Sequence, residues 1–211
     1  MYKKILLIVL FLVLIAINLI IWYTEKNQVR LPIANKMVHK IAPKKHPYTK
    51  AGEPPIALQE AFELQLEKHE NDLKKHRYAI LIDYDLPLFV ERLWLMDRQS
   101  CEYIIHSKVS HAYNSGLIYA TKFTNKPNTN TSCIGAFRTG GSYHGSFGYA
   151  MKLHGLEKGI NDNAFKRAIV VHKEVALYSW GCFMTKPEIN KKIIDLTKNG
   201  TFIWVHKSGY N

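Results

Sequence analysis

The feature that most restricts how this chain can fold is an apolar run near its amino terminus. The run extends from Ile5 to Tyr23, is rich in Leu and Ile, and is interrupted only by Asn18. About twenty such residues in a helix cross the hydrocarbon core of a bilayer. A cleavable signal peptide has a shorter apolar segment followed by small residues, and no such site follows here. We therefore expect residues 1–23 to form an uncleaved transmembrane anchor.

Charges on either side of the apolar run indicate its orientation. Lys3 and Lys4 precede the run, which favours keeping the start of the chain in the cytoplasm, and Trp22 suits a membrane interface. Lys26 and Arg30 follow closely and weaken this asymmetry. We expect a single-pass protein of the cell inner membrane whose remaining residues are periplasmic. A cleaved signal would leave the same residues outside the cytoplasm.

Two segments separate the predicted anchor from the predicted folded domain. Residues 24–55 are polar and basic, contain five prolines and show no sustained period, as is typical of a linker. In residues 56–76, Leu58, Phe62 and Leu66 recur at helical spacing, with Glu and Lys on the opposite side. We expect an amphipathic helix over residues 56–76 that packs on the domain.

The remaining residues, 77–211, have the pattern of a mainly β domain with a few helices. Most of the aromatic residues lie here, where they favour strands and supply large buried surfaces. Strand-like runs bounded by turn residues occur at residues 78–84, 92–97, 102–107, 168–172 and 202–206. The residues at 97–100 predict a hairpin turn. Residues 114–163 are rich in Gly and Asn, so we expect loops over much of that segment.

One helix is predicted near the carboxyl terminus. Thr185 and Glu188 have the spacing of a capping box, and Pro187 lies between them in the first turn. Isoleucines then recur at helical spacing, and Gly200 stands where a helix would end. The spacing therefore predicts a helix that begins near Thr185 and ends before Gly200.

Charge and cysteine content restrict the partners. The formal net charge of +12 attracts polyanions of any kind, or is simply a solvated basic surface. Because the lysines are scattered without interleaved aromatics, no nucleic-acid partner is predicted. Cys101, Cys133 and Cys182 form no CxxC pair and lack the histidine spacing of a zinc site, so no metal or cofactor is predicted. Outside the cytoplasm Cys101 and Cys133 could form a disulfide, which would leave Cys182 free.

Cys182 and His172 are the candidate catalytic residues. His172 ends an apolar strand-like run, and Cys182 follows ten residues later. A histidine that takes the thiol proton generates a thiolate, which is the effective nucleophile. The alternative is that Cys182 is a small buried apolar residue and His172 a hydrogen-bonded residue at a strand end. Both interpretations stay open on the residues alone.

The residues before Cys182 predict a catalytic turn. Gly181 permits a close approach of backbone to substrate, and the main-chain N–H groups of Trp180, Gly181 and Cys182 could stabilise an oxyanion. The helix expected near Thr185 would place a positive dipole end close to the sulfur. We therefore expect the pKa of the Cys182 thiol to be depressed.

An ordered series of motifs extends from residue 78 to residue 206. It comprises YAILIDYDLP at 78–87, NSG at 114–116, ATKFTN at 120–125, GLEKGINDNAFKRAIVVH at 155–172 and SWGC at 179–182. This series resembles the murein L,D-transpeptidase catalytic domain family. The resemblance implies a β-sandwich catalytic domain over residues 77–211.

The resemblance also implies an activity. In this family a cysteine attacks the peptidoglycan stem peptide between its third residue, a diamino acid, and the terminal D-alanine. A thioester forms and D-alanine leaves. An amine from a neighbouring stem then gives a 3→3 cross-link, or water gives a carboxypeptidase reaction. The implied roles are the nucleophile for Cys182, the base for His172, the thiol-framing turn for Ser179, Trp180 and Gly181, and substrate binding for Tyr143 and Arg167.

The chain also departs from the family pattern. The interval between His172 and Cys182 is shorter than usual, Lys173 replaces a small residue, and Phe183 and Met184 replace a frequent Pro-Ala pair. Two alternative functions therefore stay open. One is a catalytically inactive cell-wall-binding module of the same fold, and the other is a different Cys/His peptidase or amidase. The predicted partners are peptidoglycan stem peptides and the membrane, and the sequence predicts no oligomeric state.

Overall fold

The computed structural model describes residues 52–210. The predicted anchor and nearly all of the predicted linker lie outside the described residues. Within residues 52–210, no helix has the length and apolar character needed to cross a membrane. The helices are α2 (Ile56–Lys68) and α3 (Pro187–Thr197), with short 3-10 turns η2 (Glu70–Asp72) and η3 (Tyr113–Ser115).

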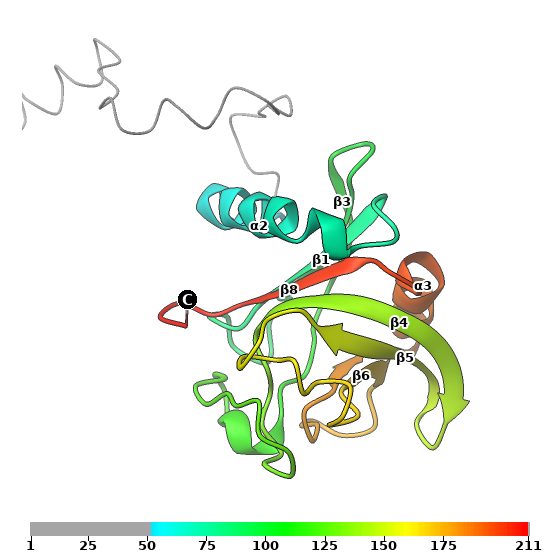
Figure 1. Ribbon diagram of the computed structural model, residues 1–211. Coiled ribbons are helices and arrows are strands. Elements are labelled where there is room, and N and C mark those ends of the chain that lie inside the picture. Colours follow the sequence, from blue (N-terminus) through cyan, green and yellow to red (C-terminus); the bar gives the residue numbers. More distant parts are fainter. Residues whose placement is uncertain (1–51, 211) are drawn as a thin grey trace, which may run out of the picture. The chain divides into compact units, whose positions relative to one another are not determined.

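Eight strands form one mixed sheet in the order β3-β2-β1-β8-β4-β5-β6-β7 (Figure 1). They are β1 (Tyr78–Asp83), β2 (Leu93–Asp97), β3 (Glu102–Ser107), β4 (Gly135–Gly145), β5 (Gly148–Gly155), β6 (Val170–Lys173), β7 (Phe183–Thr185) and β8 (Phe202–His206). Two pairs, β1–β8 and β6–β7, are parallel, and the other neighbours are antiparallel. The expectation of a mainly β domain with a few helices is confirmed.

The strands are connected as one continuous sheet, where the sequence predicted the two sheets of a sandwich. The reason lies in β4, which pairs with β8 through its first half and with β5 along its length. Its register shifts between Thr139 and Ser142, and such a bulge bends a strand. Figure 1 shows β4 curving strongly between β8 and the β5–β6 part of the sheet. The bent strand β4 thus joins the two halves of the sheet.

Each face of the sheet has its own apolar cluster. On one face, residues from β1, β2, β4, β5, β6, β7 and β8 surround Ile193 and Ile194 of α3. On the other face, Phe62 of α2 stacks on Phe202 and Trp204 of β8, with ring centroids 6.0 and 6.3 Å apart. This second cluster draws its buried strand residues from β1, β2, β8 and the start of β4. This cluster includes no buried residue of β5, β6 or β7.

Several predicted boundaries are wrong for identifiable reasons. The helix expected over residues 56–76 ends at Lys68, because His69 leaves the helix to pack against Phe202. The strand expected from residue 168 begins at Val170, since Ala168 adopts a left-handed φ of 53°. The hairpin turn at residues 97–100 is confirmed between β2 and β3.

The capping box predicted at Thr185 is also wrong. Thr185 is the last residue of β7, and its buried Oγ1 has no hydrogen-bond partner among the described residues. The helix-capping residue is Lys186, which makes no side-chain capping bond, and Pro187 opens α3. The tertiary pairing of β7 therefore prevails over the local capping signal.

The segment predicted as loops contains the two longest strands. Residues Gly135–Gly145 and Gly148–Gly155 form the β4–β5 hairpin. Its glycines occupy the bulge and the turn, where a side chain would be crowded or the backbone is left-handed. Glycine content was therefore a misleading signal for loops here.

Candidate active site

His172 lies in β6, and Cys182 directly precedes Phe183, the first residue of the neighbouring strand β7. Val171 pairs with Phe183 across the parallel β6–β7 ladder, and both side chains point into the α3-side core. Because successive residues of a strand alternate between faces, His172 points to the opposite side. The thiol of Cys182 lies against the backbone just before and at the start of β6, at Ala168 and Val170.

The imidazole of His172 is prepared to accept a proton. Its Nδ1 lies 2.8 Å from the carbonyl oxygen of Lys173, so Nδ1 is the donor and Nε2 carries the lone pair. Phe147, at the β4–β5 turn, stacks on the ring with centroids 4.6 Å apart. Burial lowers the pKa of His172, and the bond to Lys173 offsets this only in part. A neutral imidazole is the form that a general base requires.

The surroundings of the Cys182 thiol disfavour its ionisation. Its Sγ donates to the carbonyl oxygen of Ala168 at 3.7 Å. Burial raises the pKa of the Cys182 thiol, although the N–H of Val170 and the guanidinium of Arg167 act in the opposite direction. Among the hydrogen bonds of residues 52–210, none joins Cys182 to His172.

The prediction of a depressed thiol pKa at Cys182 is therefore wrong. It relied on the helix dipole, and α3 begins only at Pro187, after the whole of β7. The influence of a helix dipole falls off within about the first turn. Desolvation of the thiol, which the sequence does not reveal, outweighs any such effect.

Ser179 holds the turn before Cys182 in place. Its N–H donates to the carbonyl oxygen of His111 at 3.0 Å, and its carbonyl oxygen accepts from the N–H of Tyr113 at 2.8 Å. Its Oγ accepts from the N–H of Gly181 at 3.1 Å. One of the three N–H groups predicted for an oxyanion site is thus already bonded. The N–H groups of Trp180 and Cys182 donate to no group of the described chain.

Gly181 cannot be replaced without movement. Its φ of 133° lies in a region that side chains rarely adopt. A Cβ there would lie 2.5 Å from Cδ1 of Ile169 and 3.2 Å from the carbonyl oxygen of Thr131. Close packing against these neighbours therefore places the Cys182 backbone, while Trp180 beside it stays 73% exposed.

Arg167 contacts protein groups close to the site. Its Nη1 donates to the carbonyl oxygen of Thr124 at 2.5 Å and to Sγ of Cys133 at 2.6 Å. Its Nη2 donates to the carbonyl oxygen of Thr131 at 2.6 Å. The guanidinium thus ties residues 124–133 to the segment before β6. The contact with substrate that the sequence suggested stays a prediction.

The disulfide between Cys101 and Cys133 is absent, and all three cysteines are free. Cys133 is fully buried beside Arg167, and burial raises the pKa of its thiol to about 11. Cys101 lies exposed at the β2–β3 turn, where its φ is 57°. A pair is excluded because one thiol is in the core and the other on the surface.

Tyr143 lies on the same face as His172. Tyr143 pairs with Ala150, and Ala150 pairs with His172, so the three residues form a row across β4, β5 and β6. Paired residues of neighbouring strands share a face. Tyr143 is 38% exposed. The structure therefore brings it to the surface that borders His172.

The sequence did not single out the network that supports the Cys182 turn. Arg92 is fully buried and donates through Nε and Nη2 to the carbonyl oxygen of Val109, at 3.1 and 2.9 Å. Its Nη2 also lies 3.0 Å from Nδ1 of His111. The adjoining Ser110 exchanges hydrogen bonds with Met184 of β7 at 3.0 and 3.1 Å. An arginine at the start of a predicted strand gives no sequence signal of this burial.

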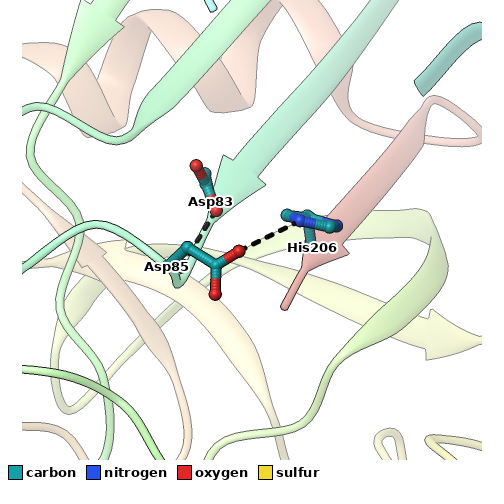
Figure 2. A group of neighbouring side chains, drawn as sticks. All are labelled: Asp83, Asp85 and His206. Carbon is teal, nitrogen blue, oxygen red and sulfur yellow. Dashed lines mark hydrogen bonds and ion pairs between the residues drawn. The ribbon is translucent and has the colours of Figure 1, made fainter. Parts of the chain in front are cut away.

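A separate acidic cluster lies at the carboxyl ends of β1 and β8. Figure 2 shows Asp83, Asp85 and His206 there, and their candidate ligand atoms lie within 4.8 Å of one another. Burial opposes ionisation of Asp85, yet hydrogen bonds from Lys207 and Ser208 outweigh it and lower its pKa to about 2. The Lys207 ammonium lies 2.6 Å from the Asp85 carboxylate and would repel a cation. The cluster therefore fastens the carboxyl-terminal segment to β1.

Comparisons with known proteins place the chain in a family. Solved structures with a similar fold include the L,D-transpeptidase of Stackebrandtia nassauensis, with 12% identity over 69% of this chain and 63% of that chain and a TM-score of 0.39. L,D-transpeptidase 1 of Mycobacterium tuberculosis has 14% identity over 62% of each chain and a TM-score of 0.37. A mutant of the helical cell shape determining protein Pgp2 of Campylobacter jejuni has 9% identity over 73% of this chain and 57% of that chain, with a TM-score of 0.46.

The chain spans less than two thirds of the length of each of these proteins. No curated protein matches the sequence. The family model described as L,D-transpeptidase catalytic domain matches residues 54–206, which is most of the chain. On that match, this protein belongs to the L,D-transpeptidase catalytic domain family.

Proposed function

We propose that the protein is a peptidoglycan L,D-transpeptidase in which Cys182 is the nucleophile and His172 the general base. The observation that carries the proposal is the pairing of β6, which contains His172, with β7, which Cys182 directly precedes, in a chain of this family. The neutral His172, with Nε2 free to accept a proton, supports the same roles. The donor would be the tetrapeptide stem of peptidoglycan.

In the proposed acylation step, Nε2 of His172 takes the proton of the Cys182 thiol. The thiolate attacks the carbonyl carbon of the third stem residue, and the free N–H groups of Trp180 and Cys182 are placed to stabilise the oxyanion. The carbon–nitrogen bond then breaks, and His172 returns the proton to the amine of the leaving D-alanine. A thioester on Cys182 results.

In the proposed second step, an amine of a neighbouring stem attacks the thioester carbonyl. His172 takes a proton from that amine, the carbon–sulfur bond breaks, and the proton returns to the sulfur of Cys182. The product is a 3→3 cross-link. Water in place of the amine gives a carboxylate and makes the reaction a carboxypeptidase reaction.

One observation favours a second candidate function, an inactive wall-binding module of the same fold. The Cys182 thiol donates to Ala168, and burial raises its pKa. A thiol that stayed in this arrangement would not be activated. This candidate predicts binding to peptidoglycan without modification of Cys182.

Intact mass of the full chain distinguishes the two candidates. The protein is incubated with a disaccharide-tetrapeptide, and separately with a carbapenem, beside Cys182→Ala and the matched control Cys101→Ala, which removes an exposed thiol. The transpeptidase predicts a thioester mass gain and released D-alanine in the wild type and in Cys101→Ala, and neither in Cys182→Ala. His172→Gln should slow acylation by about 10²-fold or more. Binding to sacculi with no adduct from either reagent would favour the inactive module.

We further propose that residues 5–23 anchor the protein in the inner membrane and that the domain is periplasmic. The apolar run and its flanking charges support this topology. The exposed Cys101 provides a test, because a membrane-impermeant maleimide reaches only extracytoplasmic thiols. Labelling of Cys101 in intact spheroplasts is expected. Labelling that requires lysis would place the domain in the cytoplasm.

A further inference from the structure

A lysine held between two exposed aromatic rings lies on the same face as the site. The Nζ of Lys152, in β5, is 5.7 Å from the ring centroid of Tyr143 and 5.7 Å from that of Phe165. The two rings are 38% and 51% exposed. Lys152 forms no ion pair with any residue of the described range 52–210. Its charge is therefore held in place and open to a ligand.

The strand register places Lys152 beside the proposed nucleophile. Lys152 pairs with Val170 of β6, and the N–H of Val170 contacts the thiol of Cys182, which directly precedes β7. Two strand spacings, from β5 across β6 to the line of β7, correspond to roughly 10 Å. An extended peptide covers that distance in about three residues. A substrate whose carbonyl reaches Cys182 thus extends to Lys152.

The β4 bulge leaves space above this part of the sheet. Gly140, opposite Lys152, is adjacent to a second glycine, Gly141. A Cβ on Gly140 would lie 3.1 Å from the Cβ of Lys152 and 3.1 Å from Nε2 of His154. The absence of side chains at these two positions therefore keeps Lys152 accessible on the sheet face.

Arg138 and Lys74, like Lys152, place a positive charge close to His154. The ring of His154 stacks on Phe165 with centroids 4.8 Å apart. Burial lowers the pKa of His154, and the nearby charges of Arg138, Lys152 and Lys74 lower it further. Charges of one sign that gather on one face attract a ligand of the opposite sign.

We propose that Lys152, framed by Tyr143 and Phe165, binds a carboxylate of the donor stem peptide. This inference rests on the proposed function and names the part of the substrate that the face recognises. Charge complementarity and the span of about three residues place that carboxylate on the second or third stem residue. The glutamate at the second position and the diamino acid at the third each offer one.

Equilibrium binding to the full chain tests the proposal without turnover. Cys182→Ala is titrated with tetrapeptides whose carboxylate is free or amidated at the second or the third residue. In that background, Lys152→Met should weaken binding of the free peptide by about tenfold or more, since it removes a charge-assisted hydrogen bond. Lys152→Arg should retain most of the affinity. The matched control Lys166→Met, which removes an exposed nearby charge, should leave affinity within about twofold.

The amidated peptides identify the carboxylate. Amidation of the recognised carboxylate should weaken binding to the protein that retains Lys152 by the same factor, and should have no effect on the Lys152→Met variant. Equal affinities of these two proteins for the free peptide, or an amidation effect that persists in Lys152→Met, would overturn the proposal. Acylation of Cys182 in the wild type is measured separately, so failure of the proposed function leaves this binding result interpretable.

Discussion

Replacement of Arg92 by methionine should destabilise the domain by about 3 to 5 kcal/mol. The guanidinium is fully buried and donates to three acceptors, which are the carbonyl oxygens of Leu86 and Val109 and Nδ1 of His111. In Arg92→Met each acceptor loses its donor, at about 1 to 3 kcal/mol for a buried group. Relief of guanidinium desolvation and the apolar fit of methionine against Tyr84 offset part of that loss.

The assay is denaturant unfolding of the full chain, followed by the fluorescence of the buried Trp94 and Trp204. Arg77→Met is the matched control, because Arg77 is 60% exposed and solvent screens its ion pair with Asp97. A loss in Arg92→Met no larger than in this control would refute the reasoning. In that case the buried acceptors would have found other donors.

The same variant should also affect the site. Ser110, next to the carbonyl that Arg92 holds, is hydrogen-bonded to Met184 and lies against the carbonyl oxygen of Cys182 at 3.5 Å. Acylation of Cys182 should therefore slow in Arg92→Met at temperatures where the domain stays folded. An unchanged acylation rate would show that the Cys182 turn does not depend on this network.

Three further predictions concern single residues. Gly181→Ala should lower the free energy of unfolding by about 1 to 3 kcal/mol, because alanine is strained at the left-handed φ of this position. It should also abolish acylation, because the new Cβ would lie 2.5 Å from Cδ1 of Ile169. Phe147→Ala should expose His172 and raise its pKa toward the ordinary value, so the acid limb of the pH–acylation profile should move to higher pH. Asp85→Asn should cost roughly 1 to 2 kcal/mol at neutral pH, because the pKa of Asp85 is lowered to about 2. In chemical unfolding, the difference in stability between Asp85→Asn and the wild type should reach its full size above about pH 4. It should decrease as the pH falls below that value and disappear near pH 2, where Asp85 becomes protonated in the folded protein.

For each of these three predictions, a second substitution or a change of pH tests the proposed cause. Gly159→Ala shares a left-handed φ of 80° but meets no atom within 4 Å, so it should leave acylation intact while Gly181→Ala does not. Phe147→Leu should shift the acid limb of the pH–acylation profile less than Phe147→Ala. Equal profiles for the wild type and both variants would show that Phe147 does not shield His172 from solvent. A stability difference for Asp85→Asn that persists unchanged at pH 2 would show that its charge is not the cause.

The strands that sequence reasoning located have strong local signals. Tyr78–Asp83 and Phe202–His206 are apolar runs bounded by turn residues, and the structure confirms both. The β4–β5 hairpin was missed because its glycines at the bulge and the turn have the composition of a loop. Whether a glycine-rich segment is a strand depends on its pairing with β8, which is distant in sequence.

The sequence predicted which residues belong to the candidate site more reliably than it predicted their surroundings. Cys182, His172 and Tyr143 were selected from motif and resemblance. The structure places His172 and Tyr143 on one face, and Cys182 directly before the neighbouring strand β7. The direction of the Cys182 pKa was wrong because desolvation depends on what covers the thiol. The surroundings of Arg167 were also not predictable, because its guanidinium binds carbonyl groups of residues 124–133, which are distant in sequence.

The sequence by itself determined the family, the mainly β class and the residues able to perform cysteine chemistry. These follow from periodicity and from short motifs, which are local properties of the chain. Tertiary structure alone decided that Arg92 is buried and that Lys152 lies on the same face as His172. Both depend on strand register and on packing between distant segments, and a shift of one residue would turn each side chain to the other face of the sheet.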